Sequence, residues 1–220
     1  MHIIEPLPDI PGVPKLNRFA AIDPATTALL VIDLQNCFLQ DGYPAFVPHA
    51  LDVVAPINIL ADALRSAGAT VIYTRHTVVD EPPRAPPAWQ RDDPALAPLF
   101  DPMRRGTESH ALHASVAHDA DDLVIDKHRF SAFLPVSSDI DAQLKARGID
   151  TVIITGTLSN ICCESSARDA HMLGYRVFFP ADANAALTDA DHNATLRSMD
   201  ACFADVRPSG EIIAMIDLAA

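Results

Sequence analysis

Three side chains with complementary chemistry stand where hydrophobic runs end in this chain of 220 residues. Asp33 ends the run 28–33, Lys127 ends the stretch 122–127 just after its apolar part, and Cys162 follows the run 151–155 after a short turn. A thiol attacks a carbonyl efficiently only as the thiolate, which a nearby cation stabilises. A carboxylate can take the thiol proton and later return it to a leaving amine. These residue types together predict nucleophilic catalysis by a cysteine.

A repeated local pattern indicates the sheet that positions these residues. At 66–73, 145–154 and 172–179, a helical segment closes with a glycine, and a short run of β-branched or aromatic residues follows. Glycine often ends a helix because it readily adopts the left-handed backbone conformation. Short apolar runs are typical of strands in a buried parallel sheet. Helices that repeatedly precede such strands are typical of a parallel α/β sheet.

The same signals predict the full order of elements. Strands are expected at 28–33, 70–74, 122–127, 151–155, 176–179 and 205–206, and helices at 50–67, 138–147, 160–173, 189–203 and 208–217. Open parallel sheets bind ligands beyond the carboxyl ends of their strands. This topology therefore brings an acid, an ammonium group and a thiol to one edge of the sheet.

The turn 156–162 and the helix after it add two further expectations. Backbone N–H groups at a helix start can hold the oxyanion of a tetrahedral intermediate. The positive end of the helix and the Lys127 ammonium are expected to lower the pKa of the thiol. Cys163 begins a stripe of small residues that suits packing against the sheet. We therefore expect Cys163 to be buried and Cys162 to be the exposed nucleophile.

Charge and composition exclude several classes of function. The chain has 16 basic and 29 acidic residues and a net charge of −13, which disfavours binding to nucleic acid or to an acidic membrane surface. No apolar run approaches the roughly 20 residues that span a bilayer, and the first residues lack the pattern of a signal peptide. We expect a cytoplasmic protein whose partner is a small molecule, and neither nucleic acid nor membrane.

The cysteines give no sign of a disulfide framework or a metal site. Two of the four are adjacent, and no Cys-x-x-Cys pair occurs, so all are expected as free thiols. Neither a metal nor a cofactor is predicted.

A proline-rich segment interrupts the alternation of strands and helices. Residues 80–102 hold seven of the 18 prolines, which disfavours both helix and strand. Long loops in compact domains are often lids or binding loops. We expect such a role for this segment, which contains the only tryptophan, Trp89. The alternative is a surface insertion or an oligomer contact. At ~150 residues per domain, we expect one domain over 1–220, with an N-terminal arm at 1–26 and an insertion or lid loop at 80–105.

Three sequence runs resemble the isochorismatase-like cysteine hydrolases. They are 31–38 (VIDLQNCF), 126–133 (DKHRFSAF) and 156–170 (GTLSNICCESSARDA), and the resemblance covers about 27–216. It implies a three-layer αβα fold in which a six-stranded parallel sheet has helices on both faces.

The resemblance also assigns roles to individual residues. It implies that Asp33, Lys127 and Cys162 form the catalytic set, and it selects the first of the two adjacent cysteines as the nucleophile. It further implies a cis peptide bond between Thr157 and Leu158. The oxyanion hole would consist of the backbone N–H groups of Leu158 and Cys162.

Departures from the family's patterns narrow the activity. Cys37 stands where the first motif usually has a second aspartate, which we interpret as a modest local change. The Asp-x-His metal site of the nicotinamidase branch is missing, since Gln40-Asp41-Gly42-Tyr43 follows that motif. The isochorismatases proper, which cleave a vinyl ether, generally lack the cysteine that this chain carries. The resemblance therefore favours the amidohydrolase branch.

We accordingly expect cysteine-dependent hydrolysis of a linear C–N bond in a small amide or ureido compound through a thioester intermediate. The resemblance suggests biuret-like compounds, N-carbamoyl amino acids or ureidoacrylate-like compounds as substrates. The alternatives are a vinyl-ether hydrolase of the isochorismatase type and, in another class, a non-catalytic or thiol redox-sensing relative. The resemblance also implies a homo-oligomer, either a dimer or a tetramer.

Four side chains are expected as walls of the substrate pocket: Gln35, Phe38, Trp89 and Phe130. Two of these expectations have direct structural alternatives. The two phenylalanines could belong to the core, and the glutamine could only brace its loop.

Overall fold

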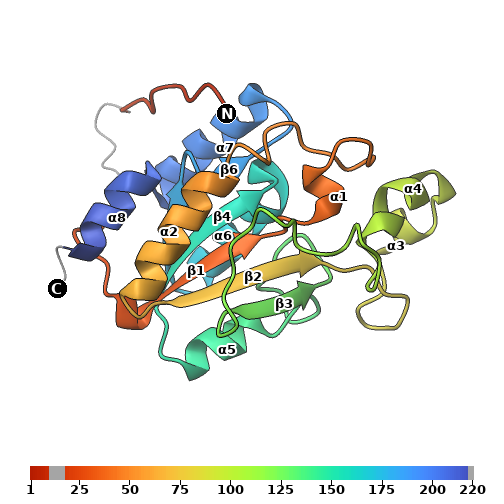
Figure 1. The fold of residues 1–220 in the computed structure, drawn as a ribbon, viewed down its shortest axis with the longest axis horizontal. Coiled ribbons are helices and arrows are strands. Elements are labelled where there is room, and N and C mark those ends of the chain that lie inside the picture. The colour runs from red at the N-terminus through yellow and green to blue at the C-terminus, as the bar shows by residue number, and fades with distance from the viewer. Residues whose placement is uncertain (10–17, 218–220) are drawn as a thin grey trace.

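The structure, a computed structural model, describes residues 1–9 and 18–217, which contain a parallel sheet between two layers of helices (Figure 1). The strand order is β3-β2-β1-β4-β5-β7, and all pairs are parallel. This architecture confirms the predicted α/β fold. The strands are β1 (Thr27–Ile32), β2 (Thr70–His76), β3 (Leu123–Lys127), β4 (Thr151–Thr157), β5 (Arg176–Pro180), β6 (Asn184–Ala185) and β7 (Asp205–Arg207).

All six predicted strands are present, and β6 is an addition to them. It pairs with the end of β4 through Asn184 and Ala185, away from the main strand order. Two residues are too few to produce a periodic sequence signal, so the sequence could not predict this strand.

Helices cover both faces of the sheet. In Figure 1, α2 (Val54–Ser66) and α8 (Ser209–Asp217) lie on one face, and α5 (Ile140–Ala146), α6 (Glu164–Met172) and α7 (Asp189–Ser198) lie on the other. Within the described ranges, no helix is long and apolar enough to cross a membrane. Four short helical elements lie outside these layers and outside the segment 80–105: η1 (Pro24–Thr26), α1 (Asn36–Leu39), η4 (Ser159–Cys163) and η5 (Met199–Phe203).

The alternating side chains of β1 build two separate cores. Leu29 and Val31 belong to the core beneath α2 and α8, whereas Leu30 and Ile32 belong to the core beneath α5, α6 and α7. Successive side chains of a strand point to opposite faces of a sheet. Because β1 is covered on both faces, its sequence is continuously apolar, which explains why the run could be recognised as a strand.

The segment 80–105 is more helical than the sequence analysis predicts. It contains α3 (Ala88–Arg91), η2 (Pro94–Leu96), α4 (Ala97–Phe100) and η3 (Asp101–Met103). Proline occupies the first turn of the last three. Proline is well tolerated there, because its missing N–H has no intrahelical partner and its φ suits a helix. The prolines therefore begin single-turn helices here, and the expectation that they disfavour helix is wrong.

The predicted N-terminal arm, 1–26, is described only in part, because residues 10–17 lie outside the described residues. Residues 1–9 contact α7. The backbone N–H of Ile3 donates to Asp189 at 3.3 Å, and that of Glu5 donates to Asn193 Oδ1 at 2.9 Å.

Gly156, near the end of β4, occupies a position that no other residue fits. Its φ is +114°, and a Cβ would lie 2.1 Å from the carbonyl oxygen of Ile32 on β1. We expect Gly156→Ala to lower the free energy of unfolding by about 3 kcal/mol or more, or to prevent folding. Gly148→Ala is the matched control, since Gly148 has φ +70° with open space around it; its expected loss is about 1 kcal/mol. Urea unfolding measures both, and equal losses would contradict the steric argument.

Candidate active site

The carboxyl ends of three strands bring Asp33, Lys127 and Cys162 together. Lys127 Nζ lies 2.7 Å from Asp33 Oδ2 and 3.4 Å from Cys162 Sγ. The side chains of Asp33 and Lys127 are both 0% exposed. Asp33 directly follows β1, Lys127 ends β3, and Cys162 follows β4. The sheet edge thus assembles the three residue types at contact distance, although they are far apart in the sequence.

The Asp33 carboxylate is held from two sides. Asp33 has φ +55°, a left-handed conformation that turns the chain away from β1. Its Oδ1 accepts a hydrogen bond from Thr74 Oγ1 at 2.8 Å, while Oδ2 faces the Lys127 ammonium. Polar atoms of Asp33, His76 and Cys162 all lie within 4.8 Å of one another. This position lets Asp33 act as the base for the neighbouring thiol.

The Lys127 ammonium lies at the centre of the site. Besides Asp33 and Cys162, it contacts the carbonyl oxygen of Arg129 at 3.1 Å and His76 Nδ1 at 3.2 Å. Burial alone would lower the pKa of Lys127, but Asp33 and Cys162 raise it above its ordinary value. Burial and the Lys127 charge hold the pKa of His76 well below its ordinary value. His76 is therefore neutral and accepts from the ammonium through Nδ1.

Two expectations about Cys162 are wrong. The residue is only 4% exposed, although it does line a cavity. Its pKa is raised to about 12 instead of lowered, because burial outweighs the attraction of the Lys127 charge and the Asp33 carboxylate adds repulsion. Since Asp33 already neutralises Lys127, the site at rest holds a neutral thiol beside an ion pair. A nucleophilic attack by this thiol would require it to lose its proton during the attack.

The raised pKa predicts slow alkylation of Cys162. A thiol with a pKa of about 12 holds very little thiolate near neutral pH. We expect iodoacetamide at pH 8 to label the exposed Cys202 first, and labelling of Cys162 to accelerate as the pH rises toward 12. Peptide mass spectrometry after timed exposures measures both rates. Faster labelling of Cys162 than of Cys202 at pH 8 would show that the thiolate is populated at rest.

The turn between β4 and α6 has the cis peptide bond, Thr157–Leu158, that the family resemblance implies. The following element, η4, is a π-helical turn instead of the first turn of an α-helix. Leu158 lines the same cavity as Cys162, and its carbonyl accepts the N–H of Cys163 at 3.1 Å. Cys163 is fully buried, as predicted, and its thiol donates to a carbonyl of β4 at 3.8 Å.

The Cys162 thiol faces an apolar cavity of about 200 Å³, which we call the inner cavity. Phe38 and Phe130, both predicted as pocket walls, line it. The segment 80–105 contributes Phe100 and Met103, so this segment forms part of the pocket wall. Among the described residues, the polar side chains in this lining are those of Cys162 and His76 alone. The inner cavity therefore suits a small substrate portion without charge.

A wider space of about 530 Å³, which we call the vestibule, adjoins the inner cavity. His76 and Phe130 line both spaces and so mark their junction. Trp89 lines the vestibule, is 53% exposed, and has its ring 6.2 Å from that of Phe130. The predicted pocket residue Trp89 therefore lies outside the inner cavity.

Gln35 belongs to the lining of neither space and braces the surrounding loops. Its side chain is fully buried. The amide nitrogen donates to the carbonyls of His76 and His110 at 3.2 and 2.9 Å, and the amide oxygen accepts the N–H of His76 at 2.7 Å. His76 is a site residue that the sequence analysis missed. It ends β2, which runs two residues beyond the predicted strand 70–74, so the strand-end rule missed it because the predicted boundary was too early.

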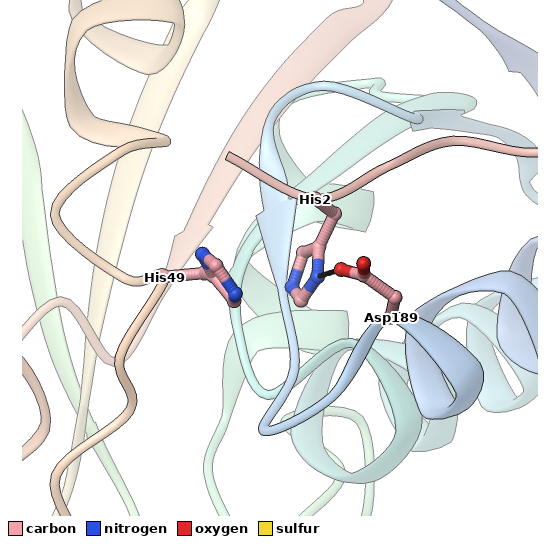
Figure 2. A group of neighbouring side chains, drawn as sticks. All are labelled: His2, His49 and Asp189. Carbon is pink, nitrogen blue, oxygen red and sulfur yellow. Dashed lines mark hydrogen bonds and ion pairs between the residues drawn. The ribbon is translucent and has the colours of Figure 1, made fainter.

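Figure 2 shows a separate polar group, His2, His49 and Asp189, where residues 1–9 meet α7. His2 Nδ1 lies 2.7 Å from Asp189 Oδ1, and His2 Nε2 accepts the N–H of Ala186 at 2.9 Å. A neutral imidazole carries one ring proton. That proton is therefore on Nδ1 and is donated to Asp189, which leaves neither nitrogen of His2 available to a metal ion. The group anchors the first residues to α7.

Comparisons with known proteins agree with this fold. The family model described as Isochorismatase domain matches residues 27–211. The chain is 31% identical over 188 residues to the ureidoacrylate amidohydrolase RutB of Caulobacter vibrioides, a match that covers 79% of this chain and 80% of that protein. The chain belongs to the isochorismatase family, as predicted.

Solved structures show the same fold. A cysteine hydrolase from Pseudomonas syringae pv. phaseolicola 1448A matches with a TM-score of 0.85 and 32% identity, covering 95% of this chain and 100% of that one. The N-carbamoylsarcosine amidase from Thermoplasma acidophilum matches with a TM-score of 0.67 and 26% identity, covering 84% of this chain and 96% of that one.

Proposed function

We propose that this protein hydrolyses a linear C–N bond in a small amide or ureido compound, with Cys162 as the nucleophile. The observation that carries the proposal is a thiol at the wall of a small cavity, in contact with a buried ion pair between Asp33 and Lys127. The ion pair offers a base for the thiol proton and a cation for the charge that develops during attack.

In the first half of the reaction, Cys162 Sγ attacks the substrate carbonyl carbon while Asp33 takes the thiol proton. Lys127 contacts both groups, so it stabilises negative charge on either of them. The backbone N–H groups of Leu158 and Cys162 hold the oxyanion of the tetrahedral intermediate. Asp33 then gives its proton to the leaving nitrogen, the C–N bond breaks, and the acyl group remains on Cys162, as a thioester from an amide or as the corresponding thiocarbamate from a ureido compound.

In the second half, water hydrolyses the thioester. Asp33 takes a proton from the water as its oxygen attacks the thioester carbonyl. The C–S bond breaks, and Asp33 returns the proton to the departing sulfur of Cys162. This step restores the neutral thiol and the ion pair, so each turnover consumes one water and needs no other reactant.

The names of the relatives support a hydrolase of carbon–nitrogen bonds other than peptide bonds. One curated relative is named a ureidoacrylate amidohydrolase, and one structural relative is named an N-carbamoylsarcosine amidase. Both names describe compounds with a ureido group. N-carbamoyl amino acids and ureidoacrylate-like compounds are therefore our first candidates, with biuret-like compounds next. The homodimer or homotetramer and the cytoplasmic location stay predictions.

The test is ammonia release from a panel of ureido compounds, simple amides and biuret, with Cys162→Ala as the parallel control. We expect release from at least one ureido compound by the wild-type protein and none above background by the variant. Hydrolysis of an isochorismate-like vinyl ether that persists in Cys162→Ala would contradict the proposal, because that reaction needs no thiol. Reversible oxidation of Cys162 without turnover of any amide would favour a redox-sensing relative.

A further inference from the structure

Arg129 brings a positive charge to the vestibule without a carboxylate beside it. Its guanidinium donates to the backbone carbonyls of Pro83 at 3.2 Å, Arg84 at 3.2 Å and His128 at 2.6 Å. In the part of the chain that the structure describes, no acidic side chain pairs with it. A guanidinium has five N–H donors, so two of them remain for a ligand. Such donors favour a carboxylate, which can accept two parallel hydrogen bonds.

The other charged side chains of the vestibule differ from Arg129. Arg168 donates to Glu164 Oε1 from two nitrogens, at 2.9 and 2.6 Å, and to Ser198 Oγ at 2.6 Å. Its charge is therefore largely compensated. Asp169 also lines the vestibule, and its carboxylate repels an anion. An anion entering this space therefore finds its best partner at Arg129.

Arg129 is close to the reacting groups. Its carbonyl oxygen accepts from the same Lys127 ammonium that contacts Cys162. His76 lies at the junction of the two spaces. Burial and the Lys127 charge lower the pKa of His76 most, and the Arg129 charge also contributes to this lowering. A molecule that reaches from the thiol past His76 therefore meets the field of Arg129.

The inner cavity cannot accommodate the charged end of a substrate. Within the described ranges, its lining is apolar apart from His76 and Cys162, and it has no charged side chain. A carboxylate placed there would lose its hydration without gaining a cationic side chain from the lining, which is strongly unfavourable. The carboxylate of an acidic substrate must therefore lie in the vestibule.

We propose that the vestibule is a subsite for the carboxylate of the substrate, with Arg129 as its anchor and the scissile carbonyl at Cys162. This inference rests on the proposed function and narrows it. Among the candidate substrates, it selects ureido acids such as N-carbamoyl amino acids over uncharged compounds such as biuret.

Two probes of nearly equal shape isolate the carboxylate. N-carbamoylglycine carries it, and isobutylurea replaces it with an isopropyl group of similar size. We expect the wild-type protein to prefer N-carbamoylglycine. Arg129→Gln should lower kcat/KM for N-carbamoylglycine about 10- to 100-fold, mainly through KM, because a charge-assisted contact away from the reacting atoms contributes chiefly to binding. Turnover of isobutylurea should stay within about twofold.

Arg91→Gln is the matched control. Arg91 lies in the segment 80–105, is exposed, pairs with Asp92 and is outside the vestibule lining. The variant therefore also replaces one arginine with glutamine, but away from the proposed subsite. It should change neither substrate's kcat/KM by more than about twofold. Equal losses on both probes in Arg129→Gln would overturn the inference, since they would show that Arg129 only ties Pro83 and Arg84 to the site.

A binding measurement separates failure of the inference from failure of the proposed function. Both probes are titrated calorimetrically into Cys162→Ala, with and without Arg129→Gln. Binding of N-carbamoylglycine that disappears only with Arg129→Gln supports the carboxylate subsite even if the wild-type protein turns over neither probe. Equal affinity for the two probes in Cys162→Ala would overturn the inference even if the wild-type protein releases ammonia from both.

Discussion

Cys162→Ala is expected to lower kcat/KM for ammonia release about 10³-fold or more, whereas Cys163→Ala should keep it within about threefold. Removing a covalent nucleophile takes away the whole thioester route, and such losses are large. Cys162 lines the inner cavity and contacts Lys127 Nζ. Cys163 is fully buried in the core beneath α6 and lies outside that lining. The comparison therefore assigns the nucleophile between two adjacent thiols.

Rapid quenching and intact-protein mass spectrometry give a second readout for the two cysteine variants. The wild-type protein and Cys163→Ala should both carry the acyl mass during turnover, and Cys162→Ala should not. Thermal unfolding serves as the control, because Cys163→Ala leaves a small cavity and is expected to cost about 1 kcal/mol. An acyl adduct on Cys162→Ala would mean that Cys163 is the nucleophile, and the mechanism would have to be rebuilt around it.

The proposed catalytic set could be brought together from sequence because its assembly depends on topology. Asp33 follows the continuous apolar run of β1, a strand buried on both faces, and Lys127 ends β3, a short edge strand that begins with three apolar residues. Parallel strands end at a common edge, so the positions of the ends suffice to place the side chains together. The same argument places His76 beside Lys127 only when β2 is given its observed end, two residues beyond the predicted one.

The state of the Cys162 thiol could not be predicted in this way. Its burial depends on residues far from it in the sequence, such as Phe46 and Phe100, which close the inner cavity around it. Local patterns do not report contacts of this kind, and the pKa of the thiol follows the burial. The availability of Arg129 to a ligand likewise depends on which distant carbonyls its guanidinium reaches.

Lys127→Met is expected to abolish activity and to lower the free energy of unfolding by about 3–5 kcal/mol at pH 7. Methionine has a similar length but no charge, so Asp33 stays buried without its cation. The double variant Asp33→Asn with Lys127→Met leaves neither buried charge. It should recover at least about half of the lost stability and none of the activity. Urea unfolding together with ammonia release measures both effects.

Comparison of the single and double variants separates electrostatics from packing. If the double variant is as unstable as Lys127→Met, the loss comes from the methionine side chain fitting poorly among its neighbours. If the double variant is active, Asp33 and Lys127 are not the base and the cation of the mechanism. Recovery of stability without activity is the outcome that supports a buried ion pair retained for catalysis.

The pH dependence of stability tests the same ion pair independently. Against the effect of burial, Asp33 and Cys162 raise the pKa of Lys127 above its ordinary value of 10.5, so the folded protein holds this proton more tightly than the unfolded chain. The resulting stabilisation is fully present below about pH 10.5 and is lost as the pH rises through the raised pKa. The difference in unfolding free energy between the wild-type protein and Lys127→Met should therefore be constant from pH 7 to about pH 10 and shrink above that. If the difference in unfolding free energy does not shrink at higher pH, the charge of Lys127 is not the cause of the stabilisation.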